Sequence, residues 1–464
     1  MTGNAASSNA ISSAIDELRA LLGERLSTSA AVREQHGHDE SWHEGHDPDA
    51  VAFAKSTDEV AAIVKICAHH GLPVIPFGAG TSLEGHVAAL HGGVSIDLMG
   101  MDEVVALNQE DLDVTVQAGV TRKQLNTYLR ETGLFFPIDP GADASLGGMA
   151  ATRASGTNAV RYGTMRNNVL SLTVVLPDGR VIRTARRARK SSAGYDLTAL
   201  FVGSEGTLGV ITEVTLRLYG IPEAMSSAVC SFGSVAGAVD TTIQTIQSGI
   251  PVARIELLDE ISIDAINKYA KLDFEIAPTL FLEFHGTEAS VAEQAEMVGE
   301  LASENGGGDF SWTTVAEERT KMWQARHDVA YATAALRPNS RLWASDVCVP
   351  ISRLAECILE TKKDNDATDL LAAIVGHVGD GNFHVTYLVG VDKPDEVAEA
   401  KRLNEILVAR ALAMDGTCTG EHGVGYGKID FLVAEHGEAI SVMRTLKRAM
   451  DPDNIMNPGK IVRL

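Results

Sequence analysis

Residues 140–158 read Pro140-Gly-Ala-Asp-Ala-Ser-Leu-Gly-Gly-Met-Ala-Ala-Thr-Arg-Ala-Ser-Gly-Thr-Asn158 and contain almost no bulky side chain. Such a stretch exposes backbone N–H groups and lets a large flat ligand approach the main chain. A second small-residue loop, Gly78-Ala-Gly-Thr-Ser-Leu-Glu-Gly85, follows an expected strand at 73–77. One loop suits a pyrophosphate and the other suits an isoalloxazine ring, so the two together predict a buried flavin dinucleotide. The alternative is a pair of glycine-rich turns without a ligand.

The loop at 78–85 differs from the common nucleotide-binding loops. The dinucleotide fingerprint requires Gly or Ala at its sixth position, where this loop has Leu83. A Walker A loop requires Lys and then Ser or Thr after the last glycine, where this chain has His86. These differences disfavour nicotinamide and ATP as ligands.

The pattern around these loops predicts an α+β fold. A helix is expected after Ser56, with apolar residues on one face and Gly71 at its end. Strands are expected at 94–98, 114–117 and 208–218, and a hairpin at 172–184. After Pro222, candidate strands alternate with long amphipathic helices, which predicts a second domain built on a sheet.

Composition excludes several classes of protein. The 464 residues carry a formal net charge of −23, which opposes binding to nucleic acid or anionic lipid. The five cysteines are scattered and form no Cys-x-x-Cys pair, so disulfides and zinc ribbons are not expected. No signal-peptide core and no run of 18 apolar residues is present, so no transmembrane segment is expected. The predicted location is the cytoplasm, with peripheral association at the inner membrane as an alternative.

The stretch His377-Val-Gly-Asp-Gly-Asn-Phe-His384 predicts a metal site. Asp-Gly between apolar segments is typical of a two-residue hairpin turn, which would place His377 opposite His384. Opposed residues have Cβ atoms about 4.5–5.5 Å apart, close enough for two imidazoles to bind one ion. The cluster Gly420-Glu421-His422-Gly423 can add a carboxylate ligand and a base. The alternative is that both histidines cap a turn and bind only backbone.

Seven ordered motifs together resemble the FAD-linked D-2-hydroxyacid dehydrogenases, and within them the cytochrome-type D-lactate dehydrogenases. The resemblance covers roughly residues 35 to 464. The motifs are the loop 78–86, the tract 137–163, Gly203-Ser-Glu-Gly-Thr-Leu-Gly209, Asp346-Val-Cys-Val-Pro350, 376–384, 420–428 and Asn457-Pro-Gly-Lys460.

This resemblance implies an α+β fold of the vanillyl-alcohol oxidase type. Its FAD-binding domain has two subdomains, and its cap domain is built on an antiparallel sheet. The predicted boundaries are an N-terminal helical segment and loop at 1–47, the FAD-binding domain at 48–222, the cap or substrate domain at 223–418, and a C-terminal segment at 419–464 that returns to the FAD domain.

The resemblance also implies which residues contact FAD. Covalent attachment in the wider fold often uses a His immediately after the two-glycine turn, and Thr81 at that position predicts noncovalent FAD. The predicted contacts are Pro76, Gly78, Ala79, Gly80, Thr81, Ser82, Pro140, Gly141, Ala144, Ser145, Gly148, Met149, Thr152, Ser155, Gly156, Asn158, Ala159, Tyr162, Gly163, Glu205, Gly209, Val210, Ile211 and Asn457.

The implied reaction is oxidation of a D-2-hydroxy acid to the 2-oxo acid, with hydride passing to flavin N5. A divalent metal, Zn, Mn or Fe, would be held by His377, His384 and Glu421, with His422 as the general base. Arg326 would clamp the substrate carboxylate.

The identity of the substrate and of the partners stays open. The small residue Ala330 predicts that D-lactate or a larger analogue fits, and D-2-hydroxyglutarate and glycolate are alternatives. Electrons would pass to a cytochrome, a quinone or an electron-transfer flavoprotein, and a homodimer is a further open alternative. A metal-dependent hydrolase could use the same histidines but would leave the two glycine loops unexplained.

Overall fold

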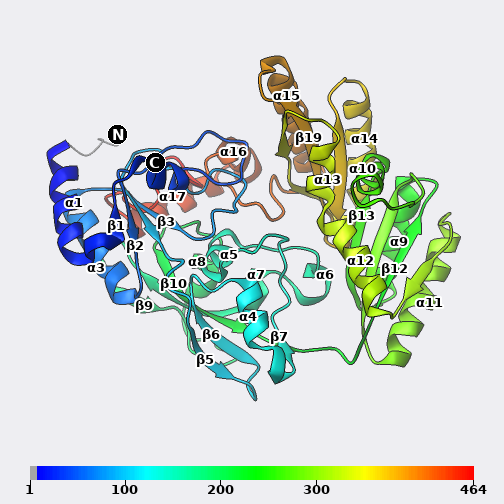
Figure 1. The fold of residues 1–464 in the computed structure, drawn as a ribbon, viewed down its shortest axis with the longest axis horizontal. Helices are drawn as coiled ribbons and strands as arrows, with labels where there is room; N and C mark the ends of the chain where they lie inside the picture. The colour runs from blue at the N-terminus through cyan, green and yellow to red at the C-terminus, as the bar shows by residue number, and fades with distance from the viewer. Residues whose placement is uncertain (1–7) are drawn as a thin grey trace. The chain divides into compact units, whose positions relative to one another are not determined.

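The computed structural model describes residues 8–464, which form two compact units (Figure 1). Unit 1 contains the chain up to Ser155, Gly163–Ile221 and Glu421–Leu464. Unit 2 contains Gly156–Tyr162 and Pro222–Gly420. The short segment 156–162 thus lies in unit 2, although it falls inside the range 48–222 expected for the FAD-binding domain. Residues 1–7 of the expected N-terminal segment lie outside the described residues.

Unit 1 begins with a mixed four-stranded sheet in the order β1-β2-β4-β3. The Ser56 side chain caps the following helix by accepting from Glu59 N, and Gly71 ends that helix in the left-handed conformation, as predicted. The Glu59 carboxylate accepts from Lys55 N at 2.9 Å and pairs with Arg25. The elements are α1 (Ser8–Leu22), η1 (Gly23–Arg25), β1 (Leu26–Ser27), α2 (Ala30–His36), β2 (Ala50–Phe53), α3 (Thr57–His70), β3 (Val74–Phe77) and β4 (Val94–Asp97).

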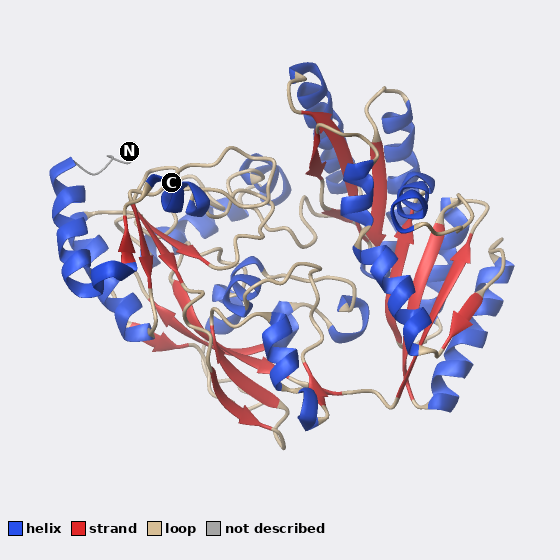
Figure 2. Ribbon diagram, in the orientation of Figure 1, coloured by secondary structure: helices blue, strands red, loops and turns tan. Residues whose placement is uncertain are grey.

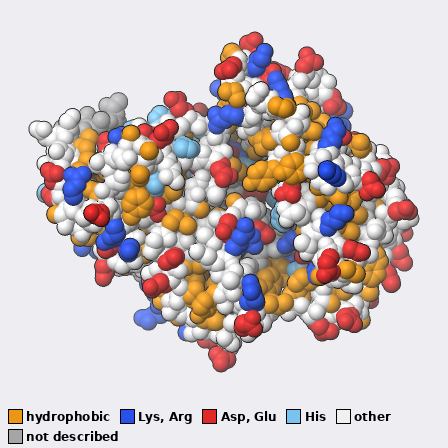
Figure 3. All heavy atoms as spheres, viewed as in Figure 1, with side chains coloured by type: hydrophobic (Ala, Val, Ile, Leu, Met, Phe, Trp, Pro, Cys, Tyr) orange, Lys and Arg blue, Asp and Glu red, His pale blue; other side chains and the backbone are white. Residues whose placement is uncertain are grey.

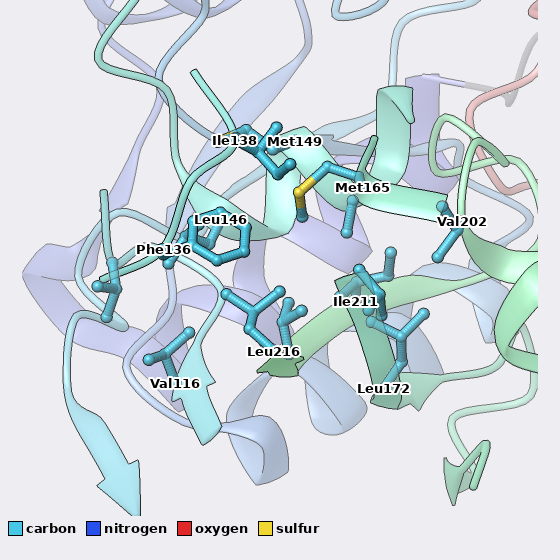
Figure 4. Close-up of a cluster of buried hydrophobic side chains, with 14 of the residues drawn as sticks. Val116, Phe136, Ile138, Leu146, Met149, Met165, Leu172, Val202, Ile211 and Leu216 are labelled. Atoms are coloured by element: carbon cyan, nitrogen blue, oxygen red, sulfur yellow. The ribbon is translucent and has the colours of Figure 1, made fainter. Parts of the chain in front are cut away.

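A five-stranded antiparallel sheet, in the order β5-β6-β10-β8-β9, forms the other half of unit 1. Side chains from its strands and from α5 meet in one buried apolar cluster (Figure 4). Full burial of each large apolar side chain contributes about 1.5–3 kcal/mol, so this cluster fixes α5, and the small-residue tract that contains it, on the sheet. The strands and α5 are β5 (Val104–Asn108), β6 (Asp113–Gln117), α5 (Leu146–Thr152), β8 (Val169–Val175), β9 (Val181–Arg183) and β10 (Val210–Arg217).

The C-terminal segment is part of unit 1. Val74 N donates to Ile455 O at 2.7 Å, and Asn457 N donates to Val74 O at 2.8 Å, so the end of the chain lies beside β3. The remaining elements of unit 1 are α4 (Arg122–Tyr128), η2 (Arg130–Thr132), β7 (Leu134–Phe135), α7 (Met165–Asn168), α8 (Leu197–Phe201), β11 (Tyr219–Gly220), α16 (Ile429–His436) and α17 (Ala439–Met450).

Unit 2 is built on an eight-stranded antiparallel sheet (Figure 2). Its main path is β15-β12-β14-β13-β18-β19-β16, and β17 pairs with β19. The strands are β12 (Ala224–Ser231), β13 (Val252–Leu258), β14 (Thr279–Gly286), β15 (Ser311–Thr313), β16 (Ser340–Ala344), β17 (Val347–Cys348), β18 (Ala372–His377) and β19 (Asn382–Gly390).

Helices cover this sheet. Leu258 and Phe281 form a buried cluster with residues of α10, α12 and α13, so these three helices lie over one face. The helices are α6 (Ala159–Tyr162), α9 (Val235–Gln247), α10 (Glu260–Ala270), α11 (Glu288–Glu304), α12 (Ala316–His327), α13 (Val329–Ala335), η3 (Ile351–Arg353), α14 (Leu354–Asp366), η4 (Val378–Asp380) and α15 (Pro394–Ala413). Mixed and antiparallel sheets with segregated helices confirm the predicted α+β class. No helix within residues 8–464 is both long enough and apolar enough to cross a bilayer.

The β18–β19 hairpin differs from the sequence prediction. His377 pairs with Asn382, and His384 pairs with Val375, because η4 and Gly381 make a longer turn than the two-residue Asp380-Gly381 turn that was expected. Gly381 has φ +79°, and its carbonyl oxygen accepts from Val349 N at 3.0 Å, which fixes this turn. His377 and His384 are therefore diagonal neighbours rather than directly opposed. Their rings still meet, with centroids 5.4 Å apart.

Candidate active site

A cavity in unit 1 is lined by both small-residue segments. Residues 76–83 begin within β3 and form one wall, and residues between Pro140 and Ser155 form another. Glu205 and Gly209, which precede β10, and Ile211 within β10 add to the lining. Three residues near the C-terminus complete it, namely Glu421, His422 and Asn457.

Most of the predicted FAD contacts lie on this lining. Those that do are Pro76, Gly78, Ala79, Gly80, Thr81, Ser82, Pro140, Ala144, Ser145, Gly148, Met149, Thr152, Ser155, Glu205, Gly209, Ile211 and Asn457. Gly141, Gly163 and Val210 belong to unit 1 but lie outside the lining. Gly156, Asn158, Ala159 and Tyr162 belong to unit 2, where Asn158 accepts from Arg254 Nε at 2.6 Å and Tyr162 Oη bonds His285 Nδ1 at 2.8 Å.

Close approach explains one glycine of the cavity wall, and backbone conformation explains another. A Cβ atom at Gly78 would overlap Ser145 Oγ, the side chain that caps α5 by accepting from Gly148 N. Gly80 has φ +71°, a conformation that favours glycine. The absent side chain at Gly78 lets the two small-residue segments approach one another at the cavity wall.

His86 on the cavity wall has unused hydrogen-bonding capacity. It is 5% exposed, and neither ring nitrogen has a well-oriented hydrogen-bond partner among residues 8–464, although Nε2 lies 3.4 Å from Glu205 Oε2. Burial by itself lowers the pKa of His86, but the carboxylates of Glu205, Asp39 and Glu84 raise it above its usual range. A buried polar group of this kind on a cavity wall fits a bound polar cofactor such as FAD.

Glu205 connects the cavity to the C-terminal segment. Its carboxylate accepts from Val424 N at 2.7 Å and from Gly425 N at 2.8 Å, and its backbone carbonyl accepts from Asn457 Nδ2 at 2.8 Å. A carboxylate that receives two backbone N–H groups holds the segment after His422 in place.

The predicted base His422 lies beside a buried carboxylate, Glu84, which was not among the site residues predicted from the sequence. Glu84 Oε1 is 3.7 Å from His422 Nδ1 and 3.1 Å from Lys428 Nζ, and Glu84 Oε2 is 3.1 Å from His43 Nε2. Burial alone would raise the pKa of Glu84, but Lys428, His422 and His43 lower it to about 2. The low pKa favours an ionised Glu84, whose charge lies beside the His422 imidazole on the cavity wall.

In unit 2 a second buried carboxylate joins two predicted site residues. Glu256 on β13 accepts from His377 Nδ1 at 2.7 Å, and from Arg326 Nε at 3.0 Å and Arg326 Nη2 at 2.6 Å. Burial raises the pKa of Glu256, but His377 and Arg326 outweigh burial and lower it below its usual value. Glu256 was not among the residues predicted from the sequence.

The second histidine of the hairpin is also held through Nδ1. His384 Nδ1 lies 3.1 Å from the carbonyl oxygen of Ser345 and 3.6 Å from Asp346 Oδ1. Asp346 in turn accepts from Asn382 Nδ2 at 2.8 Å and from Thr419 Oγ1 at 2.7 Å. Hydrogen bonds from residues distant in sequence thus fix both imidazoles.

The donor chemistry of His377 and His384 fits a metal ion. One ring nitrogen of His377 lies within 4.8 Å of one ring nitrogen of His384. Metal-binding histidines usually donate their other ring N–H to a carboxylate or a carbonyl, and Glu256 and Ser345 are acceptors of those two kinds. Glu421 and His422 belong to unit 1, whereas His377, His384 and Arg326 belong to unit 2.

A signal for both carboxylates was present in the sequence. Glu84 is the one charged residue of the loop Gly78–Gly85, and Glu256 stands in an apolar segment that ends at Leu258. A charged residue at an expected buried position indicates a partner. The identity of that partner depends on contacts over a long sequence separation, which the pattern does not contain.

Two family models match the chain. The FAD binding domain matches residues 48–185, and the C-terminal domain of the FAD linked oxidases matches residues 221–461.

Relatives of known name cover nearly the whole chain. The protein named "Probable D-lactate dehydrogenase, mitochondrial" of Danio rerio is 57% identical over 98% of this chain and 93% of its own length. The mitochondrial cytochrome-type D-lactate dehydrogenase of Arabidopsis thaliana is 49% identical over 97% of this chain and 80% of its own length. The mitochondrial cytochrome-type D-lactate dehydrogenase 1 of Saccharomyces cerevisiae is 40% identical over 98% of this chain and 80% of its own length.

Solved structures confirm the predicted fold. p-Cresol methylhydroxylase matches with a TM-score of 0.80 at 19% identity, covering 98% of each chain. The 4-ethylphenol oxidase of Gulosibacter chungangensis matches with a TM-score of 0.80 at 18% identity, covering 99% of this chain and 98% of its own. The similarity supports the two-subdomain FAD-binding architecture with a cap on an antiparallel sheet.

The names of the sequence relatives show that the predicted cytoplasmic location is wrong. The relatives from Danio rerio, Arabidopsis thaliana and Saccharomyces cerevisiae are all named mitochondrial, which contradicts a cytoplasmic location. The prediction relied on the absence of a signal-peptide core, and that absence does not discriminate between these two compartments.

An FAD-binding module, an FAD-linked oxidase C-terminal module and close relatives along the whole chain agree with the cavity built from the two small-residue segments. The chain therefore belongs to the FAD-linked D-2-hydroxyacid dehydrogenase family, with the cytochrome-type D-lactate dehydrogenases, and is an FAD-dependent oxidoreductase.

Proposed function

We propose that this protein oxidises D-lactate, or a larger D-2-hydroxy acid, to the 2-oxo acid with noncovalent FAD and a divalent metal. The observation that carries the proposal is the cluster of His377, His384 and Arg326 in unit 2, in a chain whose relatives are named D-lactate dehydrogenases. Imidazoles suit a metal ion, and a guanidinium suits a carboxylate. Oxidation of a 2-hydroxy acid requires both, a metal ion to polarise the substrate oxygens and a cation to bind the carboxylate.

His377 and His384 are the proposed metal ligands, through the nitrogens that Glu256 and Ser345 do not hold. Glu421, the residue at which the chain returns to unit 1, is the proposed third ligand, an assignment that rests on the sequence motif. Zn, Mn and Fe all suit this set of donors. When bound, the metal supplies Lewis-acid polarisation of the substrate oxygens and FAD accepts the hydride.

His422 is the proposed general base that takes the hydroxyl proton. Its support is the buried Glu84 carboxylate beside Nδ1, since a carboxylate there fixes the ring and stabilises the imidazolium that forms. Arg326 is the proposed clamp for the substrate carboxylate. Glu256 occupies Nε and Nη2 of Arg326, and a guanidinium has five N–H groups, so donors are left for a second anion.

The proposed electron acceptor is a cytochrome. The support is the word cytochrome in the names of the Arabidopsis and yeast relatives. A quinone and an electron-transfer flavoprotein are the other acceptors to assay.

Anaerobic bleaching of the flavin tests the proposed function. D-lactate is expected to bleach the oxidised flavin band of the purified protein, and L-lactate is not; D-2-hydroxyglutarate and glycolate complete the panel. Chelator treatment is expected to abolish bleaching while FAD stays bound, and added Mn²⁺ or Zn²⁺ is expected to restore it. A yellow protein that no D-2-hydroxy acid bleaches would contradict the proposal, and full activity in a metal-free preparation would remove the metal from it.

A further inference from the structure

We infer that Glu256 is a positioning residue that holds a metal ligand and the substrate clamp in one arrangement. The inference rests on the proposed function, in which His377 is a metal ligand and Arg326 is the clamp for the substrate carboxylate. It goes beyond that function by naming one carboxylate on which both depend.

The hydrogen bonds of Glu256 define what it can do. Glu256 is 0% exposed, and its acceptor oxygens lie 2.7 Å from His377 Nδ1 and 2.6 Å from Arg326 Nη2. A carboxylate only accepts, so Nδ1 of His377 carries the hydrogen, and in the neutral imidazole Nε2 then has the lone pair that a metal ligand requires. The same contact raises the basicity of the ligand nitrogen and fixes the plane of the ring.

The fold brings the three side chains together. Strands β13 and β18 are neighbours, and Leu257 pairs with Gly376, so Glu256 and His377 lie side by side on the sheet. Helix α12 lies over that face, where Trp323 and Ala325 are buried, and Arg326 follows them. One buried anion thus couples a strand residue to a helix residue, and neither partner can move without disturbing the other.

A second carboxylate in unit 2 provides a matched control. Glu283 on β14 is 5% exposed, bonds His285 Nε2 at 2.8 Å and lies 3.5 Å from Arg254 Nε. It repeats the carboxylate, imidazole and guanidinium arrangement of Glu256 in the same sheet. Glu283 holds neither a proposed metal ligand nor the proposed clamp, although its partners His285 and Arg254 bond the predicted FAD contacts Tyr162 and Asn158. Glu283→Gln therefore measures what the loss of a buried carboxylate in this sheet costs metal binding and substrate binding.

The experiment compares the FAD-loaded wild type with Glu256→Gln, Glu256→Asp and Glu283→Gln. After chelation and removal of the chelator, Mn²⁺ is titrated without substrate, with a fluorescent competitor reporting its dissociation constant. Glu256→Gln is expected to weaken Mn²⁺ binding about 10–100-fold. At saturating Mn²⁺ it is also expected to raise the Michaelis constant for D-lactate more than it lowers kcat, because the clamp binds ground state and transition state alike. Glu283→Gln is expected to change neither quantity.

Three outcomes separate the inference from the proposed function. Wild-type Mn²⁺ affinity in Glu256→Gln overturns the inference and leaves the proposed function intact. Wild-type protein that binds neither Mn²⁺ nor Zn²⁺ overturns the metal and the inference together. If Glu256→Gln loses FAD or unfolds, Glu256→Asp decides, because it keeps the charge on a shorter side chain; intermediate Mn²⁺ affinity supports the inference and wild-type affinity overturns it.

Discussion

Two buried carboxylates, one in each unit, hold histidines of the candidate site. Glu84 lies beside His422 and His43 in unit 1. In unit 2, Glu256 binds His377, which lies 121 positions further along the chain. A buried charge is costly unless it is paired, so each carboxylate requires its partners as much as they require it. Loss of one imidazole therefore affects both catalysis and the remaining partners, and these two effects have to be measured separately.

The base assignment predicts different results for the two histidines of Glu84. His422→Ala is expected to slow flavin reduction by D-lactate about 10²–10⁴-fold with little change in substrate affinity, because a general base contributes in the transition state. His43→Ala removes the other imidazole from the same carboxylate and is expected to stay within a few-fold of the wild type. Stopped-flow reduction of the flavin measures both. Equal losses in the two variants would assign the effect to Glu84 packing instead of proton transfer.

The attachment of FAD can be tested at His86. Thr81 stands at the usual attachment position, so acid precipitation is expected to release all of the flavin into the supernatant. His86 lines the same cavity with both ring nitrogens lacking a well-oriented partner in the described part of the chain, and His86→Asn is the matched variant. Flavin that precipitates with wild-type protein but is released from His86→Asn would contradict the noncovalent prediction and identify the attachment residue.

At the level of elements, local patterns predicted more than pairings did. Ser56 and Gly71 mark the ends of α3 as expected, because caps and left-handed ends depend on nearby residues. The predicted β18–β19 register was wrong, because the turn is fixed by a hydrogen bond from Val349, a residue outside the hairpin. The two histidines nonetheless meet, since diagonal neighbours on one face of a sheet remain within reach of long side chains.

Gly381 tests this account of the turn. It has φ +79°, and a Cβ atom there would overlap the carbonyl oxygen of Val349; Gly249 has φ +70° with no atom within 4 Å. Gly249→Ala is expected to cost about 1–2 kcal/mol of unfolding free energy from the left-handed conformation alone. Gly381→Ala is expected to cost about 1–3 kcal/mol more from overpacking. Urea unfolding measures both, and equal losses would show that the Val349 contact relaxes freely.

The N-cap of α10 predicts a pH dependence of stability. Asp259 accepts from Ser262 N and Ile374 N, and burial raises the pKa of its carboxyl to about 6. The folded chain then binds the proton more tightly than the unfolded chain, so this group's stabilisation is complete below about pH 4 and is lost as the pH rises to about 6. Asp259→Asn has no ionisable group at this position and does not lose this stabilisation. Its free energy of unfolding is therefore expected to rise relative to that of the wild type by at most about 3 kcal/mol across that window. Denaturation midpoints from pH 4 to 7 measure it.

The control for this pH effect is Asp196→Asn. Asp196 also caps a helix, accepting from Ala199 N at 2.9 Å, but from an exposed position at the start of α8. Burial does not act on this exposed carboxyl, so Asp196→Asn measures the loss of a capping carboxylate alone. If the difference in unfolding free energy between Asp259→Asn and the wild type stays constant from pH 4 to 7, the two backbone donors, and not burial, set the pKa of Asp259.

Over the whole molecule, the chain forms each unit from separated segments. Residues 156–162 belong to unit 2 although their neighbours on both sides belong to unit 1, and the chain returns to unit 1 at Glu421. Composition and periodicity report local structure, so the α+β class and the FAD segments could be predicted from them. The crossing of 156–162 could not, because α6 is fixed by contacts such as Tyr162 with His285, and these join residues 123 positions apart.

Net charge predicts how a protein acceptor reacts with the reduced enzyme. The chain carries a formal charge of −23, and Figure 3 shows many Asp and Glu side chains spread among Lys and Arg on the face drawn. A basic cytochrome is therefore expected to associate faster at low salt, and its reduction rate is expected to fall about tenfold or more between about 10 and 200 mM salt as the Debye length shortens. An uncharged quinone acceptor is the control and is expected to change little. Second-order reoxidation rates measured with both acceptors check this. A cytochrome rate that rises with salt would place the docking surface on a locally basic region such as 183–190, which contains Arg183, Arg186, Arg187, Arg189 and Lys190.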